Sequence, residues 1–198
     1  MARAGRAAQS VETRNRLLDA AVAVVATRGW EGATSRTLAA EAGVNLALIN
    51  YHFQSKDNLL VAGLEHAMLR LEALGPMPVG GGAPDLADLH GVAGGFVAAV
   101  REAPEAQMLF EALLHARHNP QVAAAIVGHL EAFRAYATRC VQHSAGRSEP
   151  NAEDRGLGVA LAAILDGLLL HALVDPTLDM RAALGALFGR LGVAGLGP

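Results

Sequence analysis

Residues 34–60 read TSRTLAAEAGVNLALINYHFQSKDNLL, and this stretch decides the fold. Apolar residues at helical spacing end at Gly43, whose missing β-carbon allows a positive φ in a turn. A second helical segment follows Asn45, whose side chain is a candidate N-cap. Two short helices joined by a glycine-containing turn are the layout of a helix-turn-helix motif, in which the second helix enters the major groove of DNA.

Helices are expected on both sides of this motif. Upstream, Ser10 is a candidate N-cap, and apolar residues recur at helical spacing until Gly29, a typical helix stop. Downstream, Ser55 is the candidate N-cap of a fourth helix. The sequence therefore predicts a helix-turn-helix DNA-binding domain over residues 11–60, preceded by a flexible basic arm over residues 1–10.

The rest of the chain also has a helical pattern. Residues 75–84 are rich in glycine and proline and are expected to form a flexible loop. Because no segment alternates convincingly between apolar and polar residues with period two, strands are not expected, and the predicted fold class is all-α with about nine helices. The helices expected after the loop span residues 85–102, 105–117, 120–145, 152–174 and 178–192.

Composition limits the classes of function. The formal net charge is −3, yet residues 1–60 carry seven Lys/Arg against five Asp/Glu, and the remainder carries nine against fourteen. A basic N-terminal third on an acidic body fits a DNA-binding module attached to another domain and disfavours a general nucleic-acid binder. No run of eighteen apolar residues occurs, so no membrane partner is expected. The N-terminus lacks the apolar core of a secretory signal, and the single cysteine, Cys140, favours the cytoplasm.

Three groups of residues resemble the DNA-binding domain of the tetracycline-repressor (TetR) family of bacterial regulators. The resemblance covers residues 11–60, and Asp166-Gly167-Leu168 followed by Asp175-Pro176 also resembles the penultimate helix of many members. The matching pieces in the DNA-binding domain are Ala20-Ala21 with Gly29-Trp30, Thr34-x-x-x-Leu38-Ala39-x-x-Ala42-Gly43-Val44, and Tyr51-His52-Phe53-x-Ser55-Lys56-x-x-Leu59.

The resemblance implies that residues 61–198 form an all-helical domain that binds a ligand and forms a homodimer. It also implies a transcriptional regulator, most often a repressor, that a small molecule releases from its operator. The expected partners are a palindromic operator, a second copy of the chain and a small, mainly apolar effector. No nucleophile elbow, phosphate-binding glycine loop or paired zinc-ligand motif occurs in the sequence, so no catalytic residue, cofactor or metal is expected.

Two kinds of DNA contact are expected from the motif. Lys56 follows the Ser55 cap, where a helix N-terminus attracts phosphate, and Tyr51 and His52 are suited to phosphate hydrogen bonds. Asn50 can pair with base edges. The residues assigned to DNA binding are Thr34, Ser35, Arg36, Asn45, Leu46, Ala47, Asn50, Tyr51, His52 and Lys56.

Three of these residues have more than one interpretation. Asn45 can read a base or serve only as an N-cap. Leu46 and Ala47 can pack on thymine methyl groups, but many TetR relatives place a charged or larger polar residue where Leu46 stands, which leaves the base code open.

Other polar clusters in the C-terminal part have competing interpretations. Glu111, His115 and His118 share one helix face, which is compatible with metal ligands and with an alternative function as a helical metal-dependent enzyme. Mixed aromatic and polar side chains on the expected helices are alternatively the walls of a ligand pocket or ordinary core. The candidate pocket residues are Phe96, Met108, Phe110, His115, Phe133, Tyr136, Cys140 and His171.

The last two expected helices carry more apolar surface than one chain can easily hide. Two copies are expected to pack these helices as a four-helix bundle around a two-fold axis. The residues assigned to this interface are Leu161, Leu165, Gly167, Leu168, Leu169, Ala172, Leu184, Leu187, Phe188 and Leu191.

Overall fold

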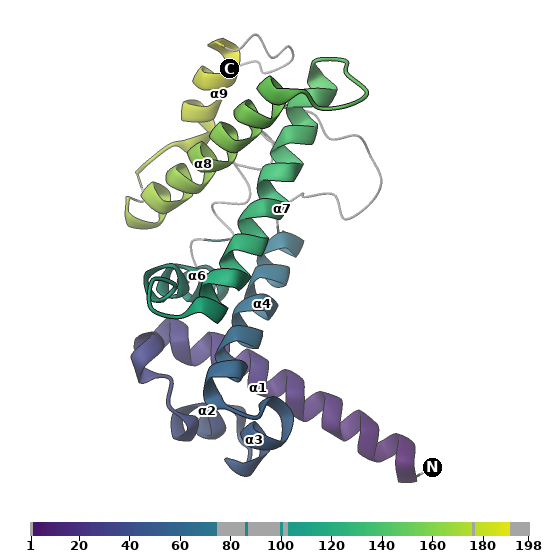
Figure 1. The fold of residues 1–198 in the computed structure, drawn as a ribbon. Coiled ribbons are helices and arrows are strands. Elements are labelled where there is room, and N and C mark those ends of the chain that lie inside the picture. Colours follow the sequence, from purple (N-terminus) through teal and green to yellow (C-terminus); the bar gives the residue numbers. More distant parts are fainter. Residues whose placement is uncertain (1, 75–85, 87–99, 101–102, 176, 191–198) are drawn as a thin grey trace. The chain divides into compact units, whose positions relative to one another are not determined.

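A computed structural model describes residues 2–74, 86, 100, 103–175 and 177–190. These residues form eight helices and no strand, which confirms the all-α prediction (Figure 1). The expected loop 75–84, most of the expected helix 85–102, Phe96 and Leu191 lie outside the described residues. The helices are α1 (Ala2–Gly32), α2 (Ser35–Ala42), α3 (Ala47–Phe53), α4 (Lys56–Leu74), α6 (Pro104–His115), α7 (Pro120–Ser144), α8 (Ala152–Val174) and α9 (Met180–Arg190).

Helix α1 is longer at its N-terminus than the sequence predicts. It begins at Ala2, so residues 2–10, expected as a flexible arm, continue the helix instead of preceding a cap at Ser10. The reason is local, because this segment is rich in alanine, arginine and glutamine, which are strong helix formers. The predicted stop at Gly29 is confirmed, since φ there is +69° and the backbone leaves helical geometry.

The helix-turn-helix segment is held by capping interactions. The Thr34 side chain accepts a hydrogen bond from the Thr37 backbone N–H, and the Thr37 hydroxyl accepts one from the Thr34 backbone N–H, so the two form a capping box at the start of α2. Gly43 ends α2 with φ +61°, as the turn requires. Ser55 Oγ accepts from the backbone N–H of Asn58 at the start of α4.

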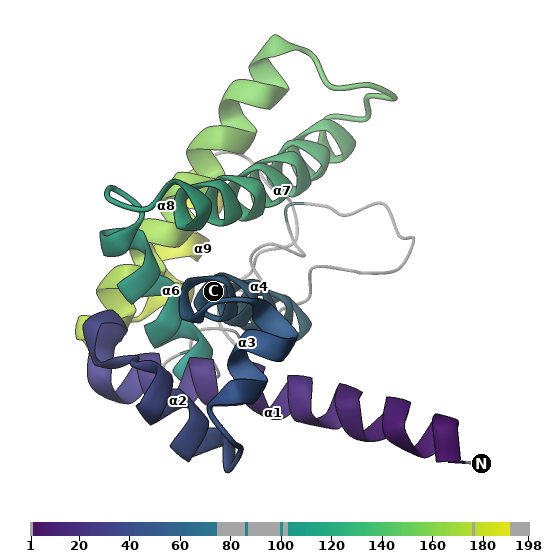
Figure 2. The same cartoon turned by 60° about the horizontal axis from the view of Figure 1, so that its bottom comes forward.

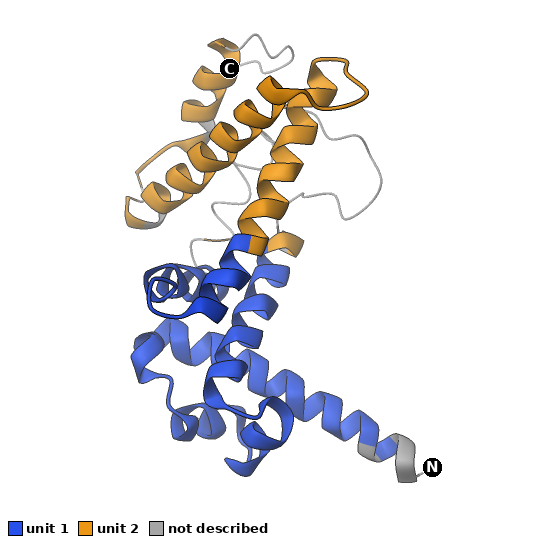
Figure 3. Ribbon diagram, in the orientation of Figure 1, with its two compact units in different colours: residues 1–71, 103–127 blue, residues 72–102, 128–198 orange. Residues whose placement is uncertain are grey.

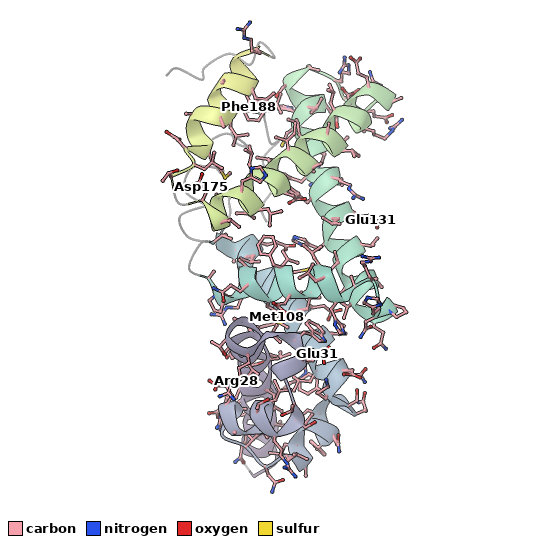
Figure 4. The ribbon with its side chains drawn as sticks, turned by 90° about the vertical axis from the view of Figure 1, so that its left-hand side faces the viewer. Arg28, Glu31, Met108, Glu131, Asp175 and Phe188 are labelled. Carbon is pink, nitrogen blue, oxygen red and sulfur yellow. The ribbon has the colours of Figure 1, made fainter. Side chains whose placement is uncertain are left out.

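The chain divides into two compact units, shown in Figure 3. Unit 1 comprises residues 1–71 and 103–127, so it is larger than the predicted DNA-binding domain because α1 packs on α6 as well as on α2. Close packing depends on Gly63 of α4, where a β-carbon would come within 2.7 Å of Ala21 Cβ and 3.3 Å of Met108 Cε. Met108, labelled in Figure 4, is fully buried in this unit.

Unit 2 comprises residues 72–102 and 128–198 and has a core of its own. Gly158 of α8 lies directly against Thr138 of α7, and a β-carbon there would be 2.2 Å from Thr138 Oγ1. The fully buried Asp154 at the start of α8 pairs with Arg147. The buried core residues, among them Phe188 of α9 (Figure 4), are Leu86, Tyr136, Ala137, Cys140, Val141, Leu161, Ala162, Ala172, Met180, Leu184 and Phe188.

Candidate nucleic-acid interface

Helix α3 has one buried face and one exposed face. Ile49 and Phe53, four residues apart, are only 1% and 5% exposed and fix the helix to the core of unit 1. Leu46, Ala47, Asn50 and Tyr51 are exposed. Figure 2 brings α2 and α3 toward the viewer, and in both views they lie beside each other along α1. This arrangement leaves the outward face of the second helix free for a partner.

Two large side chains on the exposed face of the second helix are open to solvent and are not packed in the core. Leu46 is 43% exposed and Tyr51 is 74% exposed. Together with Ala47 and the amide of Asn50, they give a surface that can offer apolar contacts to thymine methyl groups and hydrogen bonds to base edges or phosphates. Base readout by these residues stays a prediction.

The Asn45 side chain lies just before the second helix and bonds to its first residue. Its Oδ1 accepts a hydrogen bond from the backbone N–H of Ala47 at 2.9 Å. This bond ties the Asn45 side chain to the first residue of α3, although the N-cap position itself is Leu46, and a base contact by Asn45 stays a prediction. The turn before α3 is accordingly defined by Gly43 and Asn45 together.

The residues assigned to phosphate contacts are exposed to different degrees. Arg36 and Thr34 are exposed near the start of α2, whereas Ser35 is half-buried. His52 is half-buried, with its ring edge-on to Tyr51 at a centroid distance of 4.9 Å. Lys56 Nζ lies 3.3 Å from Asp57 Oδ1, a surface pair that a phosphate can replace at little cost.

Two arginines that the sequence analysis did not assign to a site lie next to α3. Arg14 and Arg16 come from the first helix and contact Phe53 and the Ala42–Gly43 turn, respectively. Arg14 also lines an open groove of about 640 Å³ with His52, Gln54 and Asn58. Sequence spacing alone could not reveal these contacts, because they join residues that are distant in the chain.

The proposed metal-ligand face has a structural role instead. Glu111 Oε2 accepts a hydrogen bond from the backbone N–H of Trp30 at 3.2 Å, and the His115 ring stacks on Trp30 with centroids 4.9 Å apart. His118 lies in the turn after α6. No group of three possible metal ligands occurs among the described residues. The alternative of a metal-dependent enzyme is therefore not supported, since these side chains secure α6 to the end of α1.

The candidate pocket residues fall into both units. Met108, Phe110 and His115 belong to α6 in unit 1. Tyr136 and Cys140 are core residues of unit 2, and Phe133 packs against them, while His171 is exposed. Within unit 2 the aromatic stripe of α7 thus faces the hydrophobic core, and a pocket formed by all these residues stays a prediction.

The residues assigned to the dimer interface also separate into two groups. Leu161, Ala172, Leu184 and Phe188 are already buried in the core of unit 2 within a single chain. Contrary to the prediction, these four side chains therefore have no surface to offer to a second copy. Gly167 and Leu187 are half-buried, as are Leu165, Leu168 and Leu169, which pack against the core. The large apolar residues that α8 does expose are Leu157, Val159, Ile164, Leu170 and Val174.

A polar cluster accompanies this exposed face. His129 Nδ1 of α7 lies 3.2 Å from Glu72 Oε1. Partial burial of the Asp166 carboxyl group raises its pKa, although much of the residue is exposed, and the positive charges of His129 and Arg134 act in the opposite direction. The partly buried surroundings of Asp166 therefore disfavour the ionised form of its carboxyl group.

Comparisons with known proteins identify related chains. The model of bacterial regulatory proteins of the tetR family matches residues 17–62, and the model of the tetracyclin repressor-like C-terminal domain matches residues 84–193. The chain is 29% identical over 170 residues to the HTH-type nicotine-responsive transcriptional repressor HdnoR of Paenarthrobacter nicotinovorans, covering 85% of this chain and 87% of that protein.

Solved structures agree with this result. The TetR-family member SCO1917 from Streptomyces coelicolor A3 is 30% identical, with a TM-score of 0.68, and the match covers 90% of this chain and 97% of that one. The multidrug binding protein EbrR complexed with proflavin is 29% identical, with a TM-score of 0.61, and the match covers 90% and 99% of the two chains.

Proposed function

The chain belongs to the tetR family of bacterial regulatory proteins, and we propose that it is a homodimeric repressor that a small molecule releases from a palindromic operator. As a member of this family it is a ligand-responsive DNA-binding transcriptional regulator and not an enzyme. The observation that carries the proposal is the exposed face at the start and along the length of α3. Its residues Leu46, Ala47, Asn50 and Tyr51 are exposed to solvent and are not part of the core.

In this proposal the residues of the motif have two different tasks. Arg36, Tyr51, His52 and Lys56 hold the protein on phosphates, with Thr34 and Ser35 beside them, and carry no sequence preference. Asn50, Leu46 and Ala47 read base edges and thymine methyl groups. Asn45 contributes chiefly to the turn before α3, where its side-chain oxygen accepts a hydrogen bond from the backbone N–H of Ala47.

Dimerisation is proposed through α8 and α9. Residues Ala152–Ala172 have a mean hydropathy of 1.5, and only 22% of this window is buried within one chain, so among the described residues α8 alone is apolar and long enough to cross a membrane. A second copy is the better cover, because Asp166 near the middle of the helix would be costly inside a bilayer. On an inverted-repeat operator, the two recognition helices of such a dimer would lie about 34 Å apart, or a multiple of that.

The effector is proposed to be a small, mainly apolar molecule bound in the C-terminal part of the chain. The aromatic side chains Phe133 and Tyr136 on α7 support this, as does the aromatic character of the compounds named for relatives, nicotine and proflavin. The predicted walls stay those named above, with His115 or His171 as a polar contact. Cytoplasmic localisation is proposed for the same protein, because its operator is there.

Release from DNA is proposed to follow a population shift. The effector stabilises conformations in which the two recognition helices no longer match successive major grooves, so operator affinity falls by linkage. Helix α4 is the proposed lever, since its residues 56–71 belong to unit 1 and residues 72–74 to unit 2.

The experiment that tests the proposal begins with selection of an operator from random duplexes by the full-length protein. The wild-type dimer should prefer the selected palindrome over a scrambled duplex by at least about a thousandfold, as specific DNA-binding proteins do. Asn50→Ala should lower affinity for the operator alone, whereas Lys56→Ala should lower affinity for both duplexes and reduce the log–log salt slope by roughly one. Equal affinity for both duplexes in the wild type would overturn the proposal.

A further inference from the structure

Arg16 of α1 is bound to the turn that precedes α3. Its Nη2 donates hydrogen bonds to the carbonyl oxygens of Ala42 and Gly43, the latter at 3.0 Å. The approach depends on the turn glycine, because a β-carbon on Gly43 would lie 2.7 Å from the same nitrogen. Helix α2 has no basic residue in its last turn, so Arg16 supplies from another helix the positive charge that a helix C-terminus favours.

Arg14 is bound at the C-terminal end of α3. Its guanidinium carbon lies 5.0 Å from the centroid of the Phe53 ring, within the range of a cation–π interaction. Phe53 is the last residue of α3 and is 5% exposed, so it connects the end of this helix to the core. Arg16 thus holds the turn that leads into α3 and Arg14 holds the C-terminal end of α3, although the two arginines stand only two residues apart in α1.

Helix α3 needs such support from outside. It has only seven residues, and isolated helices of that length are unstable in water. Leu46 stands at its N-cap without a side-chain hydrogen bond, and Gln54 at its C-cap has φ +63°, which is unfavourable for a residue with a β-carbon. The orientation of α3 is therefore set by the turn before it, by Arg14 at its last residue and by Ile49 and Phe53 on its buried face.

We propose that Arg14 and Arg16 are positioning residues for sequence recognition: Arg16 holds the turn before α3, Arg14 holds the last residue of α3, and both act on DNA through that helix. The proposal rests on the proposed function, in which α3 reads the operator. It differs from the ordinary expectation for basic residues in a DNA-binding unit, namely direct contact with phosphates. The guanidinium of Arg16 is already directed at two carbonyl oxygens, and that of Arg14 at an aromatic ring.

The two roles predict different salt dependence. A phosphate contact contributes to every DNA sequence, and its loss reduces the log–log salt slope by roughly one. A positioning contact leaves the number of neutralised phosphates unchanged, so its loss misplaces base contacts and lowers affinity for the operator only. Arg16→Gln removes the charge and the paired donors, Arg14→Gln removes the cation–π contact, and Arg14→Lys keeps a cation over the ring.

The test measures the affinity of the full-length dimer for the selected operator and for a scrambled duplex across a salt series. Arg16→Gln and Arg14→Gln should each weaken operator binding by about tenfold, the loss expected for one misplaced base contact, and change scrambled binding by less than about twofold. The salt slope should stay at the wild-type value, and Arg14→Lys should recover most of the loss. Arg117→Gln is the matched control, because Arg117 is an exposed arginine of the same unit.

Two results would overturn the inference. Equal losses on both duplexes with a slope reduced by roughly one would make the arginines phosphate contacts. Unchanged affinity for both duplexes, together with a lowered melting temperature, would leave them a purely structural role. Should Arg16→Gln fail to fold, the Arg14→Gln and Arg14→Lys pair decides the question. The proposed function is judged separately, since its failure would appear in the wild type as equal affinity for both duplexes.

Discussion

The helix-turn-helix segment of unit 1 and the α7–α8 pair of unit 2 are specified in different ways. In the helix-turn-helix segment, helix ends are defined by residues close together in sequence: a capping box starts α2, a positive-φ glycine ends it, and Ser55 caps α4. In the α7–α8 pair, α8 begins at a capping box and is aligned by the partly buried pair of Asp154 with Arg147 and by Gly158 packed against the neighbouring helix. The surface of unit 1 is thus defined mainly by local signals, whereas the packing of α8 on α7 in unit 2 also depends on a contact between helices that sequence spacing does not predict.

The largest expected effect tests the close contact in unit 2. Gly158→Ala would place a β-carbon 2.2 Å from Thr138 Oγ1 and 2.7 Å from the Thr138 backbone nitrogen. We expect a loss of about 3 kcal/mol in the free energy of unfolding, because backbone atoms cannot move aside cheaply. Denaturant unfolding followed by circular dichroism measures it.

The same helix provides the control. Gly156 has nothing within 4 Å of the position of a β-carbon, so Gly156→Ala should be neutral or stabilise the protein by up to about 1 kcal/mol. Fluorescence of Trp30, the only tryptophan in the sequence, follows unit 1 in the same experiment. Equal unfolding curves for the two alanine variants would contradict the assignment of Gly158 as the contact point between α7 and α8.

Most of the fold could be predicted from the sequence, because its helix boundaries are marked locally. Gly29, Gly43 and Ser55 each mark a boundary or cap through their own backbone or side-chain chemistry, and the structure confirms all three. Ser10 failed as a cap, since the alanine- and arginine-rich segment before it has enough helix propensity to continue α1.

The candidate site was predictable only where it lies on one element. The exposed residues of α3 follow from helical spacing against Ile49 and Phe53. The contacts of Arg14 and Arg16, and the role of Glu111 as acceptor for Trp30, join residues distant in sequence, so spacing gave no indication of them. For the same reason, periodicity on α8 could not separate residues that face its own core from residues free to meet a second copy.

The next prediction compares a buried charge of unit 2 with an exposed one of unit 1. Asp154 is fully buried and accepts hydrogen bonds from Arg147 and from the backbone N–H of Asn151, closing a capping box at the start of α8. Asp154→Ala should lower the free energy of unfolding by about 2 kcal/mol, since it removes a cap and a partly buried ion pair.

Asp57 gives the matched control, because its pair with Lys56 is on the surface. Asp57→Ala should change the free energy of unfolding by less than about 0.5 kcal/mol. Both values come from denaturant unfolding at one ionic strength. A loss for Asp57→Ala as large as that for Asp154→Ala would remove the distinction between the two regions.

A smaller effect of opposite sign is expected at the end of the recognition helix. Gln54 is the only non-glycine residue with positive φ among those described, at +63°. Gln54→Gly should stabilise the protein by about 0.5 kcal/mol, because the relief of backbone strain exceeds the entropy gained by the unfolded chain. Gln107→Gly, at an exposed position inside α6, should instead cost about 0.8 kcal/mol. Two losses of equal size would show that the positive φ of Gln54 carries no strain.

The smallest expected effect concerns Asp166 and its dependence on pH. Desolvation raises the pKa of this carboxyl group in the folded state, with His129 and Arg134 opposing the shift. The folded state therefore retains a proton that the unfolded state has lost, so the contribution of this group to stability is most favourable below the unfolded pKa and declines as pH rises through the folded pKa.

Asp166→Asn removes the unfavourable charge and should raise the melting temperature at pH 7 slightly, with the difference from wild type vanishing at pH values below the unfolded pKa. Asp57→Asn, on the exposed pair of unit 1, is the control with no such trend. If Asp166→Asn lowers the melting temperature at neutral pH, the ionised carboxylate is stabilising, and the charge on α8 is a favourable part of unit 2 after all.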